Sequence, residues 1–273
     1  MPPKATTKPS APAARVKRET PPGSLSSVTS ALRLLRVFSA EQQELGISVL
    51  AKELGVAKST AHRLAVTLAT EGFLEQNPDN GRYYLGLALF ELAALVRRRM
   101  DVSTLGRPLL EALRDTTQES THMAVLAQSD ILYLYNLESS QAVHARTYWG
   151  MRKPAFCTSE GRVLLAFGPP EHAAAVLKEG GAKRTPHTVV DAKTLTRMLN
   201  EVRRSGYALD DEESEIGMRG LAAPVRDASG RVIAAVGLSA PMQRMTKKDL
   251  RALVPQVVAT ASGISARMGY KES

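Results

Sequence analysis

The sequence has 273 residues, of which 44% are hydrophobic and 23% charged, enough to build the cores of two ordinary domains. Its 36 Lys and Arg residues exceed its 27 Asp and Glu residues, and the net charge of +9 favours polyanions without distinguishing nucleic acid from a membrane surface. No apolar run reaches the ~18 residues of a membrane-spanning helix, and the polar N-terminus lacks a signal peptide's apolar segment, so we expect a cytoplasmic protein without membrane contact.

Residues 1–24 are rich in Pro, Ala, Thr and Ser, and their charged side chains are basic except for Glu19. Such a segment cannot bury enough apolar surface to fold, so we expect a disordered basic arm. The arm either adds phosphate contacts to nucleic-acid binding or only solubilises the chain, and composition does not decide between these roles.

A winged helix-turn-helix is expected over residues 25–87. Gly55 permits the positive φ that ends a helix, and residues 55–57 are short enough to turn the next helix across the previous one. The turn-rich residues 77–81 (NPDNG) separate two short strand patterns, which predicts a hairpin, the wing. Apolar residues at helical spacing place the three helices at 26–40, at 48–55 with Ser48 as N-cap, and at 58–71.

The third helix is expected to read DNA, because its outward face is polar and partly basic and a recognition helix contacts bases mainly from its N-terminal part. Arg63 can pair with a guanine edge, and the wing would lie beside the flanking backbone or minor groove. A winged helix that docks protein or RNA is the alternative. The expected DNA-binding residues are Lys58, Ser59, Thr60, His62, Arg63 and Thr67 of the helix and Arg82 and Tyr83 of the wing.

The remaining two thirds of the chain predict an α+β domain, reached through a linker helix at 88–101. Strands and helices are segregated along this part of the sequence, as is typical of that class. Thr246 is the expected N-cap of a long C-terminal helix. The expected helices are 102–119, 159–167, 170–178, 192–205 and one from about 247, and the expected strands are 122–127, 131–137, 142–148, 221–226 and 232–239.

Several segments closely resemble the isocitrate-lyase-regulator (IclR) family. They are SVTSALRLLRVF, ISVLAKELGVAKSTAHRLAVTLATEGFLEQ, GRYYLGLALFEL, GMRKPAFCTSEGRVLLAF and RRSGYALDDEESEIGMRGLAAPVRDASGRVIAAVGLSAP, and the likeness covers nearly all of residues 26–269. The resemblance implies a transcriptional regulator with a GAF-like effector-binding domain over residues 102–273. It further implies dimerisation through the DNA-binding half, often a tetramer built as a dimer of dimers, and a small organic acid or aromatic metabolite as effector.

The resemblance also implies an effector pocket between the sheet and the loop and helix that cover it. Backbone N–H groups at the start of the Ser159 helix would suit an acid. Gly220 and Gly237 stand where some family members carry polar residues, which favours a less polar wall and a bulkier, aromatic effector. Each position also has a packing explanation. The matching positions are Gly150, Met151, Ala155, Cys157, Ser159, Gly161, Asp210, Gly220, Gly237 and Ser239.

Neither a metal site nor an enzyme is expected. The acidic cluster of residues 210–215 is interpreted as a solvated loop, and a single cysteine cannot build a multi-cysteine zinc site. HExxH, P-loop, GxGxxG and GxSxG motifs are absent, although a Cys157 nucleophile with His122 or His144 as base is conceivable. We therefore expect no cofactor. An enzyme-like metabolite domain is the alternative, and the effector, the operator and the direction of regulation stay open.

Overall fold

The computed structural model describes residues 26–39, 41–98, 101–145 and 147–271, so the expected arm at 1–24 lies outside the described residues. The chain divides between Val96 and Arg97 into two units, each of which is described by itself. Within the described ranges, no helix is both long enough and apolar enough to cross a bilayer.

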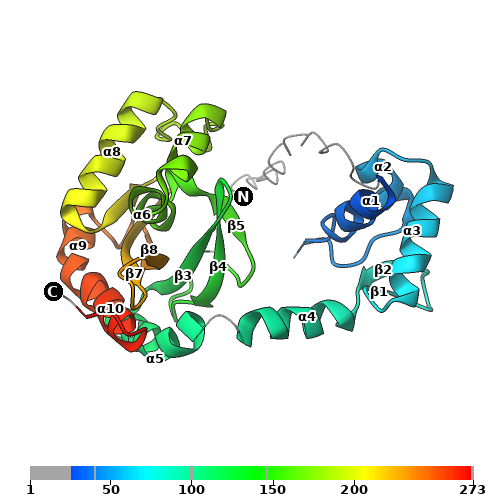
Figure 1. Ribbon diagram of the computed structural model, residues 1–273, viewed down its shortest axis with the longest axis horizontal. Helices are drawn as coiled ribbons and strands as arrows, with labels where there is room; N and C mark the ends of the chain where they lie inside the picture. The colour runs from blue at the N-terminus through cyan, green and yellow to red at the C-terminus, as the bar shows by residue number, and fades with distance from the viewer. Residues whose placement is uncertain (1–25, 40, 99–100, 146, 272–273) are drawn as a thin grey trace, which may run out of the picture. The chain divides into compact units, whose positions relative to one another are not determined.

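The described residues of the N-terminal unit form three helices, a two-stranded hairpin and most of a fourth helix (Figure 1). Leu34, Leu50 and Leu74 are fully or almost fully buried in its core. Gly55 ends the second helix at φ +68°, as its position predicts. The elements are α1 (Ser26–Leu35), α2 (Ile47–Leu54), α3 (Lys58–Thr70), β1 (Leu74–Gln76), β2 (Tyr83–Leu85) and α4 (Leu87–Arg98).

Two details of the expected helices are wrong. α1 ends at Leu35, well before residue 40, because the chain there turns through the hydrogen bonds from Arg36 N–H to Arg33 O and from Val37 N–H to Leu34 O. Ser48 does not cap α2, because the helix begins one residue earlier and the N-cap is Gly46, which has no side chain.

The C-terminal unit is built on a six-stranded antiparallel sheet in the order β5-β4-β3-β8-β7-β6. The strand expected at 142–148 is wrong: the described residues 142–145 and 147–148 form no strand, and β5 forms further along. Sequence reasoning missed β6, because two of its four residues are Asp and the strand lies at the sheet edge. The strands are β3 (Ser120–Ala127), β4 (Asp130–Leu137), β5 (Arg152–Pro154), β6 (Ala208–Asp211), β7 (Met218–Arg226) and β8 (Val232–Pro241).

Helices cover both faces of this sheet (Figure 1), and the antiparallel pairing of its strands confirms the α+β class. α5 and α10 pack on one face, and α6, with α7 and α8 behind it, packs on the other. Thr246 caps the C-terminal helix through a capping box with Asp249, but that helix breaks at Leu253 into two pieces. The helices are α5 (Asp101–Thr117), η1 (Ala155–Cys157), α6 (Ser159–Phe167), α7 (Pro170–Glu179), α8 (Ala192–Ser205), α9 (Lys247–Ala252) and α10 (Val254–Arg267).

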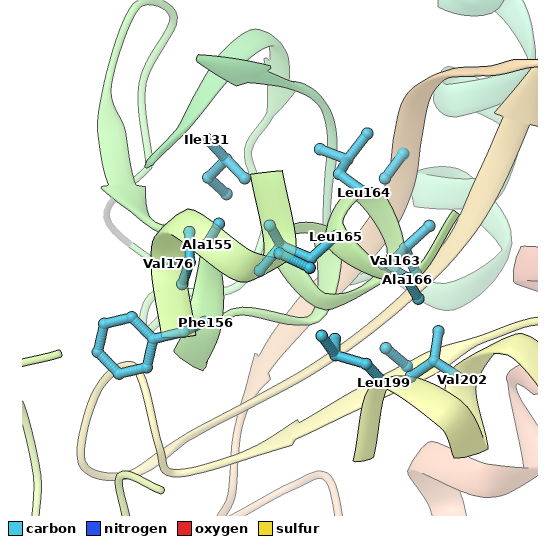
Figure 2. Packing of buried hydrophobic residues seen from close by; sticks show 14 of the residues in the cluster. Ile131, Ala155, Phe156, Val163, Leu164, Leu165, Ala166, Val176, Leu199 and Val202 are labelled. Atoms are coloured by element: carbon cyan, nitrogen blue, oxygen red, sulfur yellow. The ribbon is translucent and has the colours of Figure 1, made fainter. Parts of the chain in front are cut away.

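α6 is the central element of the core, because almost all of its residues are buried. Its side chains pack toward Ile131 of β4 and toward Leu199 and Val202 of α8 (Figure 2). The sheet face below it carries small residues, among them Ala222 and Ala235, which let a helix approach closely. Residues two apart on a strand share a face, so His122, Gly220 and Ser239 lie on the α6 side of β3, β7 and β8.

Candidate functional site

The N-terminal half of α3 presents a polar, cationic surface. Ala61 and Ala65 are fully buried and fix which face of the helix points inward. The expected residues Lys58, Ser59, Thr60, His62, Arg63 and Thr67 are all exposed, although the Thr67 hydroxyl donates to its own helix, to Arg63 O at 2.9 Å.

The wing beside α3 is held in place by its own hydrogen bonds. Asn77 and Asn80 donate to the two carboxylate oxygens of Glu44, each at 3.1 Å, and these bonds lower the pKa of Glu44. Leu45 and Tyr83 exchange two backbone hydrogen bonds of 2.9 Å, which join the wing to the segment before α2. The exposed Arg82 is therefore carried by an anchored hairpin.

Tyr83 is a wrong prediction as a DNA contact. Its side chain is only 2% exposed and belongs to the core of the N-terminal unit, together with Leu34 and Leu50. Strand alternation explains the error. Tyr83 and Tyr84 are the same residue type, so residue type does not show which one is buried, but successive side chains of a strand point to opposite faces. The Tyr84 hydroxyl donates to Glu75 at 3.0 Å.

A second site, called here the sheet pocket, lies in the C-terminal unit between the sheet and the start of α6. Its free space is about 20 Å³, room for about one water molecule. Most of its lining residues are polar or charged. They are His122, Tyr133, Ala145, Thr147, Lys153, Thr158, Ser159, Glu160, Asp210, Ser214, Glu215, Met218, Arg219, Gly220 and Ser239.

Four of the expected effector-binding residues line the sheet pocket: Ser159, Asp210, Gly220 and Ser239. A Cβ added at Gly220 would lie 2.9 Å from Ser159 Oγ, so this glycine keeps space open beside that hydroxyl. The other six expected residues are not part of the lining: Gly150, Met151, Ala155, Cys157, Gly161 and Gly237.

Packing explains three of those six positions. A Cβ at Gly161 would lie 2.2 Å from Ala155 O, and one at Gly237 would lie 2.3 Å from Leu221 O, so both glycines permit close approach of two backbones. Cys157 is fully buried, and burial raises its pKa to about 12. Such a thiol stays protonated near neutral pH, which makes it a poor nucleophile.

The centre of the sheet pocket is a hydrogen-bonded chain that sequence reasoning did not find. His122 Nδ1 lies 2.9 Å from Glu160 Oε1, and His122 Nε2 lies 2.9 Å from Ser239 Oγ. Burial raises the pKa of Glu160, but the hydrogen bond and charge of His122 offset this and leave that pKa below its ordinary value. The available signal was a histidine directly before the apolar run at 123–127 (MAVLA) of the same strand.

This Ser–His–Glu order matches the hydrogen bonding of a serine-hydrolase triad. The triad alone does not make a hydrolase, so the surrounding hydrogen-bond donors must also be considered. Such an enzyme also needs donors aimed at the oxyanion. Ser239 lies within a strand paired on both sides, opposite Ser120 and Gly220, so the backbone N–H groups of this strand serve the sheet. The arrangement is better suited to orienting a hydroxyl and an imidazole toward a bound molecule.

The acidic cluster at 210–215 is not a solvated loop. Asp210 lies on β6 and is buried, and it accepts hydrogen bonds from Glu213 N–H, Ser214 N–H and the Ser214 hydroxyl. Burial raises its pKa from 3.8 to about 6. Glu213 is also buried, and it pairs with Arg162 of α6. Among the described residues, no group of three His, Cys, Asp or Glu side chains is placed to hold a metal ion.

Arg162 is the largest fully buried side chain among the described residues, 1% exposed. It donates to Phe156 O at 3.1 Å, to Leu209 O at 3.0 Å and to the Glu213 carboxylate. Glu213 also accepts from Val189 N–H at 3.2 Å. This buried network fixes the segment after β6, which supplies Ser214 and Glu215 to the sheet pocket.

Two family models match the chain. The one described as "Bacterial transcriptional regulator IclR C-terminal" covers residues 94–266, and the one described as "IclR helix-turn-helix domain" covers residues 27–78. The HTH-type transcriptional regulator KdgR of Escherichia coli is 32% identical over 252 residues, 92% of this chain and 95% of KdgR. XynR of the same organism is 34% identical over 247 residues, 90% of this chain and 98% of XynR.

A solved structure has the same fold. The crystal structure of an IclR homolog from Microbacterium hydrocarbonoxydans, complexed with 4-hydroxybenzoate, matches with a TM-score of 0.79 and 29% identity. The match covers 89% of this chain and 99% of that one. KdgR and XynR are both named as HTH-type transcriptional regulators.

Proposed function

This chain belongs to the IclR family of bacterial transcriptional regulators, and we propose that it binds a palindromic operator with an affinity set by an effector in the sheet pocket. The observation that carries the proposal is the exposed start of α3 beside an anchored wing. The major groove admits a helix that presents such side chains.

The contacts divide into two kinds. Arg63, in the second turn of α3, is free to place its guanidinium against a guanine edge, where two hydrogen bonds distinguish one base pair from another. Lys58, at the start of the helix, and Arg82, on the wing, supply charge to phosphates, which gives affinity and position without sequence choice. Ser59, Thr60 and His62 complete the reading face.

A second copy of the chain is the proposed partner of α4. Phe90 is 66% exposed and Leu95 58% exposed, and α4 also exposes Leu87, Leu92 and Val96. Large apolar side chains gathered on one helix mark an interaction surface. A symmetric homodimer would place two α3 helices for a palindromic site, and a tetramer would pair two such dimers.

Effector binding would act by population shift. A ligand that binds one arrangement of the regulator better than another favours that arrangement and changes operator affinity by the same differential free energy. The relative complexed with 4-hydroxybenzoate supports a small-molecule site in this fold. We propose the sheet pocket as that site here, because it gathers buried polar groups from β3, β6, β7 and α6 and the half-buried Ser239 from β8.

The experiment that tests the proposal is filter binding of genomic DNA fragments to the full chain over a salt series. Selective, nanomolar-scale binding of a fragment that contains a palindrome, with affinity that falls steeply as salt rises, is the expected result. Equal binding to all fragments would refute a specific operator. Binding to RNA or protein but to no DNA fragment would favour the docking alternative.

A further inference from the structure

We infer that the effector is a short aliphatic carboxylic acid that carries several hydroxyl groups, with its carboxylate on Lys153 and its hydroxyls on the acids and hydroxyls of the sheet pocket. This inference rests on the proposed function, because it assigns the ligand class of the same pocket. It reverses the expectation of a less polar wall and an aromatic effector.

The composition of the pocket wall argues against an aromatic ligand. Ligand pockets are ordinarily lined mostly by apolar and aromatic side chains with a few polar groups. Here only three lining residues have no oxygen or nitrogen atom in the side chain: Ala145, Met218 and Gly220. Three of the lining side chains are carboxylates: Glu160, Asp210 and Glu215. These carboxylates already have partners within the protein, but a ligand hydroxyl can donate a further hydrogen bond to a carboxylate, whereas the carbon atoms of a benzene ring cannot.

The absence of side chains at Gly220 and Gly237 does not make the wall apolar. Gly237 is outside the lining, and the space beside Gly220 is bordered by Ser159 Oγ and by Asp210. The expectation of a less polar wall rested on Gly220 and Gly237 alone. The fold brings His122, Glu160 and Lys153 to the same space, and their polar groups make the wall polar.

Lys153 is the cation best placed to take a carboxylate. Its side chain is 12% exposed, and its ammonium lies 3.4 Å from Glu215 Oε2, longer than the 2.7–2.9 Å of a strong charged hydrogen bond. Arg219, the other cation of the wall, is engaged at 2.7 Å by Asp211 and at 2.7 Å by Met245 O. A ligand carboxylate would give Lys153 the close partner that Glu215 does not.

The start of α6, expected to bind the acid, is already occupied by the chain itself. The Thr158 hydroxyl accepts the Gly161 N–H at 3.2 Å. The Glu160 carboxylate receives a hydrogen bond from its own backbone N–H as well as from His122 and Ser159, and it supplies a negative charge at this helix end. A second anion there would meet a like charge, which directs the ligand carboxylate toward Lys153.

The small free space limits the ligand and predicts which segments move. About 20 Å³ holds one water, so a molecule of several carbons must displace part of the wall. Ala145 and Thr147 belong to the irregular segment between β4 and β5, and Glu215 to the turn after β6, whereas the rest of the wall is largely strand and helix. Trp149, the single tryptophan, is 53% exposed and lies two residues after Thr147.

The test titrates the full chain with four kinds of probe while Trp149 fluorescence and calorimetry report binding. Gluconate, galactonate, threonate and glycerate carry both a carboxylate and hydroxyls, glucitol carries hydroxyls only, hexanoate carries a carboxylate only, and 4-hydroxybenzoate is aromatic. We expect at least one hydroxy acid to bind at least about tenfold more tightly than glucitol, hexanoate and 4-hydroxybenzoate. Lys153→Met should weaken that binding by about tenfold to hundredfold. Lys193→Met, which replaces an exposed lysine of α8, should not change it.

The outcomes separate this inference from the proposed function. Preference for 4-hydroxybenzoate or hexanoate, equal binding of glucitol, or no response to any hydroxy acid at millimolar concentration would overturn the inference. Operator selection, measured with the same protein, would stand in each of those cases. Unchanged binding in a Lys153→Met variant that melts like the wild type would overturn the assignment of the carboxylate to Lys153.

Discussion

Replacing Arg162 by Met should destabilise the C-terminal unit strongly. The substitution keeps an unbranched side chain but removes three hydrogen bonds and leaves the Glu213 carboxylate buried without its cation. Breaking a buried ion pair by removing one partner costs about 3–5 kcal/mol. For a unit of this size each kcal/mol lowers the melting temperature by about 2–4 °C, so the expected loss is about 6–20 °C.

Scanning calorimetry of the full chain with a double-mutant cycle checks this reasoning. Adding Glu213→Gln removes the unpaired charge and keeps an acceptor for Val189 N–H, so the double variant should melt higher than Arg162→Met alone. Arg152→Met is the matched control, because its ion pair with Asp130 is exposed and worth less than about 1 kcal/mol. A loss for Arg162→Met no larger than for Arg152→Met, or additive losses in the cycle, would refute the argument.

Three further predictions concern pH, DNA and assembly. Burial raises the folded pKa of Asp210 from the ordinary 3.8 to about 6, so the Asp210 carboxyl group stabilises the fold at acid pH and this stabilisation is lost as pH rises through 6. The melting temperature of Asp210→Asn minus that of the wild type should therefore increase from pH 4 to pH 7. A constant difference would contradict the pKa shift. Arg63→Ala should weaken operator binding by about tenfold to hundredfold and relax the preference at one base pair, while Arg82→Ala should weaken all sequences alike and lower the salt slope by about one, as filter binding would measure. Leu95→Glu on α4 should shift sedimentation toward monomer and reduce operator affinity, whereas an unchanged oligomer would exclude this face from the interface.

Local patterns were sufficient to predict the DNA-binding unit. Helical spacing, Gly55 and the NPDNG turn depend on residues close together in the chain, and these predicted the helices and the wing to within a few residues. The failures there were also local. Ser48 lies one residue inside its helix, and alternation on a three-residue strand buries Tyr83 and not Tyr84.

The sheet pocket could be predicted only in part, because its chemistry depends on long-range pairing. His122 meets Ser239 because β3 pairs with β8, and it meets Glu160 because α6 crosses that face of the sheet. Asp210 looked like one member of an exposed acidic run. Its burial follows from pairing with Gly220 on β7, a contact that no local pattern in the sequence signals.

If the sheet pocket controls DNA binding, operator affinity must change as the best-bound hydroxy acid is titrated. We expect the acid to change the operator Kd of the wild type by at least about fivefold, in either direction, and we expect Lys153→Met to need at least about tenfold more acid for the same change. An operator Kd that stays constant while Trp149 fluorescence or calorimetry shows the acid bound would exclude control of DNA binding by the sheet pocket.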